Sequence, residues 1–147
     1  MSKSSFVALA LVGLAIGCNS RPSAPQPSEP PAATSPKLAE RSVTEVASAL
    51  KEKRAVVVDA NNPETREKYG VIPGAVLLSD HRSYPLAELP SDKAQPLVFY
   101  CGGTQCRASD AAANRAASAG YAQVSVMRDG IRGWVNAGQA TTSAPRS

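Results

Sequence analysis

The stretch that most constrains the fold of this chain is residues 97–109, LVFYCGGTQCRAS. Its first four residues are all apolar, and a short apolar run next to turn residues is typical of a strand buried in a sheet. This run leads directly into Cys101 and two glycines, and the alanine-rich segment 107–119 then predicts a helix. We therefore expect a cysteine at the C-terminal end of a buried strand, facing the start of a helix.

This position favours a reactive thiolate at Cys101. The first N–H groups of a helix have no intrahelical acceptor, and the helix dipole favours negative charge at that end. Such surroundings lower the pKa of a cysteine from about 8.5 to values of roughly 3.5–7.5. The sequence thus predicts a nucleophilic Cys101 in an anion-binding cradle.

The rest of the domain alternates predicted helices and apolar strands. Residues 42–45, SVTE, have the form of a capping box and begin an amphipathic helix. Residues 54–60, RAVVVDA, form a continuous β-branched run that is typical of a strand buried on both faces of a parallel sheet. The remaining predicted elements are a short helix at 64–69, strands at 75–78 and 124–127, and a loop with a short helix over 79–92. This order predicts an α/β fold with a doubly wound, mainly parallel sheet flanked by helices. Asp59 and Cys101 then both fall at C-terminal strand ends, where such sheets bind ligands.

Composition excludes several classes of function. The 16 basic and 12 acidic residues are spread along the chain without a basic run, so we expect no nucleic-acid partner. Three cysteines are too few for a disulfide scaffold. Two domain cysteines and one distant histidine do not complete a coordination shell, so we expect neither a metal site nor a cofactor.

The N-terminus predicts export and lipidation. The apolar run at 6–16 is shorter than the roughly 20 residues that a spanning helix needs, and it fits the hydrophobic region of a signal peptide. Residues 14–18, LAIGC, resemble a bacterial lipobox. The resemblance implies cleavage before Cys18 and acyl chains on that residue; an ordinary signal peptide with an incidental cysteine is the alternative.

Residues 19–37 are rich in proline and poor in large apolar side chains, which predicts a disordered tether. The predicted organisation is a signal peptide at 1–17, an acylated cysteine and linker at 18–37, one domain at 38–139 and a disordered tail at 140–147. We expect the chain to be held in the cell envelope by its lipid anchor, with the domain in the periplasm or at the cell exterior.

Four blocks of the domain, in this order, resemble the single-domain rhodaneses, a family of sulfurtransferases. The blocks are VVVDA at 56–60, GVIPGAVLL at 70–78, VFYCGGTQCRAS at 98–109 and GIRGWVNAG at 130–138. The resemblance implies that Cys101 takes a sulfane sulfur from a small donor such as thiosulfate, forms a persulfide and passes the sulfur to a thiol or cyanide acceptor. It also implies that backbone N–H groups of the loop hold the sulfur; these residues are Gly102, Gly103, Thr104, Gln105, Cys106 and Arg107.

The blocks also depart from the family pattern. The usual loop is CxxGxR, whereas CGGTQCR has the C-x5-R length that resembles rhodanese-fold arsenate reductases and Cdc25-type phosphatases. In that alternative, Arg107 clamps an oxyanion, although Tyr100 stands where those relatives usually have histidine. Asn61 stands where many members have an arginine two residues after the aspartate, so that cation is missing. Val71 replaces a histidine common in the second block.

Two alternatives concern Cys106 and Asp59. Cys106 is either a filler at the helix start or a resolving thiol for Cys101, because loop residues five apart can reach disulfide geometry. A pair of this kind also permits a non-enzymatic thiol switch or binding module. We expect Asp59 to support the loop as a structural acceptor. The main prediction is a membrane-anchored sulfurtransferase.

Overall fold

The computed structural model describes residues 37–144. The predicted signal peptide, the lipidated Cys18 and almost all of the tether lie outside these described residues. Within residues 37–144, no helix is both long enough and apolar enough to cross a membrane.

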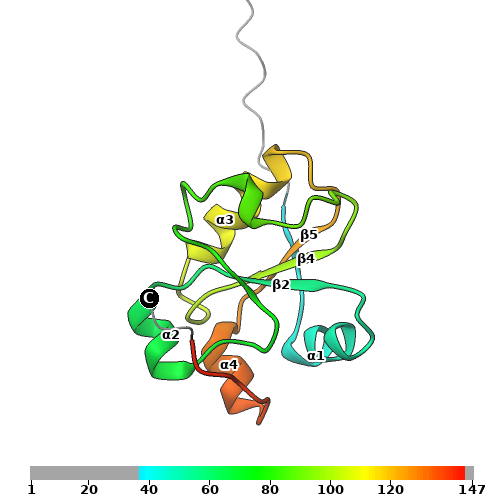
Figure 1. Ribbon diagram of the computed structural model, residues 1–147. Helices are drawn as coiled ribbons and strands as arrows, with labels where there is room; N and C mark the ends of the chain where they lie inside the picture. Colours follow the sequence, from blue (N-terminus) through cyan, green and yellow to red (C-terminus); the bar gives the residue numbers. More distant parts are fainter. Residues whose placement is uncertain (1–36, 145–147) are drawn as a thin grey trace, which may run out of the picture. The chain divides into compact units, whose positions relative to one another are not determined.

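Helices and strands alternate along the described chain (Figure 1). In order they are β1 (Ala39–Glu40), α1 (Val43–Lys51), β2 (Val56–Asp59), α2 (Pro63–Tyr69), β3 (Val76–Leu77), the 3-10 helix η1 (Leu86–Glu88), β4 (Leu97–Tyr100), α3 (Ala108–Ser118), β5 (Val124–Met127) and α4 (Gly130–Asn136). The predicted capping box is confirmed: the Ser42 side chain accepts from Glu45 N, and the Glu45 carboxylate accepts from Ser42 N at 2.8 Å. The predicted strands β4 and β5 have the expected bounds.

The five strands form one parallel sheet in the order β1-β5-β4-β2-β3. The central strand β4 places Tyr100 beside Asp59 of β2 and Met127 of β5. The C-terminal ends of these three strands therefore meet at one edge of the sheet. This confirms the predicted α/β class with a parallel sheet flanked by helices.

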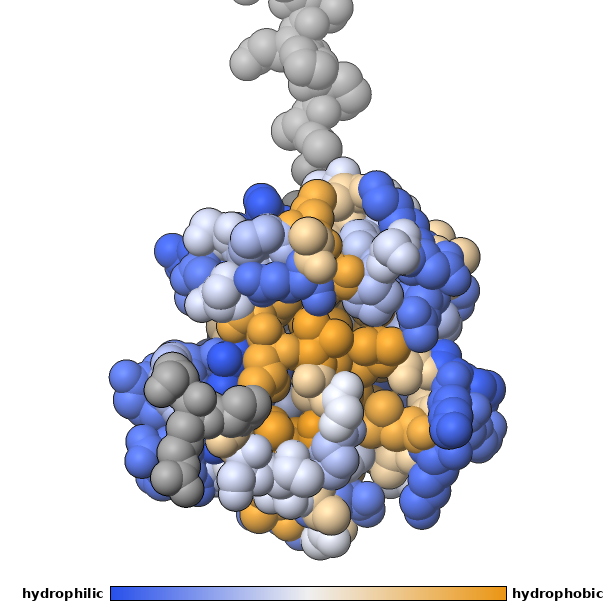
Figure 2. Space-filling model, viewed as in Figure 1, coloured by the Kyte–Doolittle hydropathy of each residue, from blue (hydrophilic) through white to orange (hydrophobic). Residues whose placement is uncertain are grey.

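Both faces of the sheet are buried, and Figure 1 shows α3 on one side of the strands and α1, α2 and α4 on the other. Along β4, Leu97 and Phe99 belong to the core with α3, whereas Val98 and Tyr100 belong to the core with α1 and α4. This alternation follows from the two-residue period of a strand. Figure 2 shows a hydrophobic band across the middle of the molecule, between more hydrophilic surfaces above and below.

Small side chains line the contact of α3 with the sheet. The buried alanines of this helix are Ala112, Ala113 and Ala116. The helix can therefore lie close to the sheet.

The ends of the domain also differ from expectation. The two-residue strand β1 has no apolar pattern to reveal it and forms by parallel pairing with β5. Residues 130–136 form the helix α4, which was not among the predicted elements. Thr142, in the segment expected to be a disordered tail, pairs with Val71 through two 2.9 Å backbone hydrogen bonds. These contacts depend on residues distant in sequence, which local pattern does not encode.

Candidate active site

Cys101 lies immediately after β4, at the edge where the C-terminal strand ends meet. Only 2% of its surface is exposed to solvent. Its sulfur forms a disulfide with Cys106, and the two Cα atoms are 6.3 Å apart. A turn within the loop directs Cys106 back toward Cys101, because Cys106 N donates to Gly103 O at 2.8 Å. The structure therefore brings together the two cysteines that the sequence singled out.

The start of α3 faces this pair. Arg107 occupies the N-cap position, and no side chain caps the helix. The first N–H groups of an α-helix lack intrahelical acceptors, so this end keeps donors and the positive end of the helix dipole for an anion. Ser109, which is 1% exposed, places its hydroxyl 3.4 Å from Cys101 Sγ. In the disulfide this sulfur carries no proton, so the serine hydroxyl is the donor.

The first turn of α4 supports the cysteine loop from behind. Ile131 N donates to Cys101 O at 2.8 Å. Gly130 has a φ of +61°, and a Cβ there would lie 2.5 Å from Gly103 N and 2.8 Å from Gly102 C. Only glycine permits both this backbone conformation and this close approach. The sequence GIRGW therefore sets the position of the loop, although its residues are about thirty positions away.

Sequence reasoning missed Arg132. Its Nε donates to Gly102 O at 3.0 Å, and its guanidinium runs alongside Gly103. A permanent positive charge thus lies next to the cysteine loop. The only signal for it was its place in the GIRGW block, which suggested family membership but not this contact.

On the opposite face of the sheet, Asp59 is fully buried and organises a polar network. Its carboxylate accepts from the Tyr100 hydroxyl at 2.7 Å, from Asn61 N at 2.7 Å and from Arg66 Nε at 3.3 Å. Ile72 N in turn donates to the Tyr100 hydroxyl at 3.1 Å. Burial raises the pKa of Tyr100, and the negative charge of Asp59 raises it further. Tyr100 therefore stays neutral, and its hydroxyl links the Asp59 carboxylate to Ile72 N by hydrogen bonds.

Asn61 connects this network to the cysteine loop. It is 8% exposed, its backbone is held by Asp59, and its Oδ1 lies 3.8 Å from the point that a Cβ on Gly102 would take. Within the described residues, Asn61 Nδ2 has no hydrogen-bond partner. At the position where many family members have an arginine, the site therefore holds the neutral side-chain amide of Asn61.

Within the described residues, no hydrogen bond joins the side chains of Arg107, Asp110 or His81 to the sulfur atoms. The Arg107 side chain is 75% exposed and contacts Asp110 Oδ2 at 3.3 Å, and Asp110 also pairs with Arg128 at 2.9 Å. An oxyanion clamp would require Arg107 to turn away from Asp110. His81 lies in the loop between β3 and η1. Two surface cavities of about 620 and 1080 Å³ are lined by other residues and do not include Cys101.

Comparison with known proteins agrees with the fold and identifies the family. A curated relative, the uncharacterized protein YibN of Escherichia coli, is 36% identical over 83 residues, which are 54% of this chain and 55% of YibN, so the chain spans about half the length of the curated relatives it matches. The polysulfide-sulfur transferase homodimer of Wolinella succinogenes has a TM-score of 0.62 at 19% identity over 74% of this chain and 81% of its own. A protein described as a possible tyrosine phosphatase from Rhodopseudomonas palustris has a TM-score of 0.59 at 21% identity, over 71% of this chain and 85% of its own.

Both solved structures are too distant in sequence to show more than a shared fold. The family profile described as the rhodanese-like domain, in contrast, matches residues 42–137, which is more than half of the chain. This match spans α1 to α4 and includes the whole cysteine loop. The chain therefore belongs to the rhodanese-like domain family.

Proposed function

We propose that this protein is a sulfurtransferase in which Cys101 carries a sulfane sulfur as a persulfide. The observation that carries the proposal is the position of Cys101 after the central strand β4, against the uncapped start of α3. Membership of the rhodanese-like family supports the reaction type, and a polysulfide-sulfur transferase shares the fold. The small donor we propose is thiosulfate.

The reaction has two halves. The Cys101 thiolate attacks the outer sulfur of thiosulfate; a new S–S bond forms, the S–S bond of thiosulfate breaks, and sulfite leaves with the electron pair. A thiolate or cyanide then attacks the outer sulfur of the persulfide, and Cys101 leaves as a thiolate. This is covalent catalysis with a ping-pong order.

The surrounding groups suit the charges in both halves. Unpaired N–H groups at the start of α3, together with those of the loop 102–107 other than Cys106 N, which donates to Gly103 O, stabilise the thiolate and the anionic outer sulfur. Arg132, next to Gly102, favours an anionic donor. The Ser109 hydroxyl donates to Cys101 Sγ. Because the first half needs a free thiolate, the Cys101–Cys106 disulfide must be opened before the sulfur is accepted.

The C-x5-R length of the loop is the feature that suggests the oxyanion-enzyme alternative, which depends on Arg107 lying over the loop. That side chain is engaged with Asp110 on the solvent side.

We further propose that Cys18 carries the lipid anchor that holds the domain in the cell envelope. The support is the LAIGC motif and the proline-rich residues after it. In a bacterial host, Cys18→Ala should abolish incorporation of labelled fatty acid and release the chain from the membrane fraction. Retention of both label and membrane association by the variant would contradict the anchor.

The sulfurtransferase proposal is tested by measuring sulfite release and sulfur transfer after the reduced chain is exposed to thiosulfate. The wild type should release sulfite, and a sulfane sulfur should leave Cys101, either to added cyanide as thiocyanate or to a thiol. Cys101→Ser should lose both products completely, because an alkoxide does not form at neutral pH. Full activity in Cys101→Ser, or no sulfite from the fully reduced wild type, would contradict the proposal.

A further inference from the structure

Cys106 is a second sulfur at the reaction centre for which sulfur transfer to an external acceptor has no use. We propose that Cys106 is itself the first acceptor: it attacks the Cys101 persulfide, releases the outer sulfur as sulfide and leaves the Cys101–Cys106 disulfide. This inference rests on the proposed persulfide chemistry and assigns its product, hydrogen sulfide, and its partner class, a dithiol reductant.

The loop geometry makes this attack direct. The Cα atoms of Cys101 and Cys106 are 6.3 Å apart, within the range that disulfides require. The hydrogen bond from Cys106 N to Gly103 O closes the intervening turn, while the bond from Ile131 N to Cys101 O fixes the other end. Because both ends of the loop are held, Cys106 meets the sulfur of Cys101 without unfolding of β4 or α3.

The step balances without an external oxidant. The Cys106 thiolate attacks Cys101 Sγ, a bond forms between these two sulfurs, and the bond from Cys101 Sγ to the outer sulfur breaks. The outer sulfur leaves as hydrosulfide with the electron pair and the proton that Cys106 gave up. The sulfane sulfur is reduced, and the two thiols are oxidised to the disulfide seen in the structure.

Cys106 has two advantages over an external thiol. A thiol joined by a four-residue loop has an effective concentration on the order of millimolar or more. The second advantage is position, because Cys106 already reaches the sulfur of Cys101, which is 2% exposed in the disulfide form, whereas an external thiol must first diffuse into the site. The outer sulfur and Cys106 compete for the same bond to Cys101 Sγ, so sulfide release and persulfide retention are mutually exclusive.

The difference in exposure between Cys101 and Cys106 determines which sulfur of the disulfide a reductant attacks. Cys106 is partly exposed while Cys101 is buried, so a dithiol attacks Cys106 Sγ and Cys101 leaves as the thiolate. The second thiol of the reductant then frees Cys106 from the mixed disulfide. Over one cycle, thiosulfate and a dithiol give sulfite, sulfide and the oxidised reductant.

The test is a single turnover of thiosulfate by the full chain. The reduced protein is freed of reductant without air, mixed with thiosulfate in the absence of any other thiol, and assayed for sulfite, sulfide and intact mass. The wild type should release one sulfite and one sulfide per chain and end at the mass of the disulfide. Cys106→Ser should release one sulfite per chain, release at least tenfold less sulfide than the wild type, and retain the mass of one added sulfur. Cys106→Ala is a second variant with the same expectation and no hydroxyl.

The outcomes separate the two proposals. If the wild type retains the added sulfur and releases no sulfide, Cys106 is not the acceptor and this inference is overturned, while the persulfide proposal stands. The inference is also overturned if Cys106→Ser releases sulfide as fast as the wild type. If neither protein yields sulfite nor gains sulfur, the sulfurtransferase proposal itself fails.

Discussion

Tyr100 and Cys101 are consecutive residues with opposite surroundings. Tyr100 points into the core with α1 and α4, and its hydroxyl is fixed between Asp59 and Ile72 N. Cys101 points to the α3 side, where its sulfur meets a helix start that no side chain caps. The Asp59 carboxylate and the Tyr100 hydroxyl on one face thus find their hydrogen-bond partners within the protein, whereas the cysteine loop keeps donors for an anion. One strand end supplies rigidity on one face and reactivity on the other.

The largest expected effect comes from removing the centre of the Asp59 network. Asp59→Ala leaves the Tyr100 hydroxyl and the largely buried Arg66 guanidinium without their carboxylate. Removing one partner of a buried ion pair costs about 3–5 kcal/mol in the free energy of unfolding. Urea unfolding followed by circular dichroism measures this loss.

Asp59→Asn is the matched control, because it retains an acceptor oxygen of the same size. It should lose less stability than Asp59→Ala. Equal stability of the wild type and Asp59→Ala would show that the network does not carry the rigidity we assign to it.

The next largest effect is expected at Gly130, where α4 meets the cysteine loop. Gly130→Ala forces a side chain into a backbone with φ of +61° and toward Gly103 N and Gly102 C. The left-handed conformation costs about 1–2 kcal/mol and the overlap about 1–3 kcal/mol more. Because the clash falls on the cysteine loop, sulfite release from thiosulfate should also fall by at least tenfold at a temperature where the variant is folded.

Gly138→Ala separates strain from displacement of the loop. Gly138 has a φ of +70°, and a Cβ there would meet no atom within 4 Å. This variant should lose only the conformational part, about 1–2 kcal/mol, and keep its rate of sulfite release. Similar loss of activity in both variants would contradict the role given to the Gly130 contact.

The sequence predicts the elements of the fold that are specified by residues close together in the chain. The apolar run of β4 and the capping box at Ser42 each specify an element within a few residues, and the structure agrees with both. β1 and the Val71–Thr142 pairing exist only because distant segments meet, so no local signal announces them. The same distinction applies to the site. The five-residue spacing of Cys101 and Cys106 offers their pairing as one of two alternatives, and the structure shows the disulfide, but Arg132 reaches Gly102 only through the packing of α4.

Arg132 tests whether the charge beside the cysteine loop serves the substrate rather than the fold. Arg132→Ala should lower kcat/KM for thiosulfate about fivefold, mainly through a higher KM, because the donor is an anion and the charge is exposed. The free energy of unfolding should change by less than about 0.5 kcal/mol. Steady-state kinetics at low and high salt measure the effect, which should shrink as salt screens the charge.

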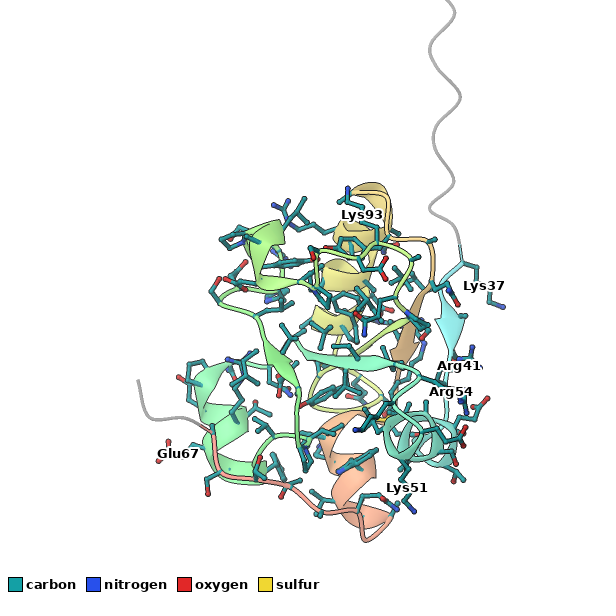
Figure 3. The ribbon with its side chains drawn as sticks, turned by 45° about the vertical axis from the view of Figure 1, so that its right-hand side comes forward. Lys37, Arg41, Lys51, Arg54, Glu67 and Lys93 are labelled. Atoms are coloured by element: carbon teal, nitrogen blue, oxygen red, sulfur yellow. A yellow bond between two sulfur atoms is a disulfide. The ribbon has the colours of Figure 1, made fainter. Side chains whose placement is uncertain are left out.

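Arg54→Ala is the control for general electrostatics. Arg54 is an exposed arginine paired with Glu52, and Figure 3 labels it beside Arg41. It precedes the N-terminal end of β2, whereas the cysteine loop follows the C-terminal end of the parallel strand β4. Arg54→Ala removes the same charge from the protein as Arg132→Ala and should leave kcat/KM for thiosulfate within about twofold of the wild type. An equal loss in both variants would assign the effect to net charge rather than to the contact of Arg132 with Gly102.

The smallest effect concerns Asp80, an exposed carboxylate that offers a contrast to buried Asp59. Hydrogen bonds from Arg82 N, the Ser83 hydroxyl and Ser83 N lower the pKa of Asp80 from 3.8 to about 2. A carboxylate whose pKa is lowered by folding stabilises the native state above pH 3.8, and this contribution is lost as the pH falls through that value toward 2. Asp80→Asn should therefore unfold at slightly lower urea than the wild type at pH 6, and the two midpoints should converge between pH 4 and pH 2. Because water screens this turn, the difference should be far smaller than that of Asp59→Ala at pH 6. A difference between wild type and Asp80→Asn that grows as the pH falls would show that a group other than Asp80 controls acid stability, and the contrast between a local turn and a buried network would then fail.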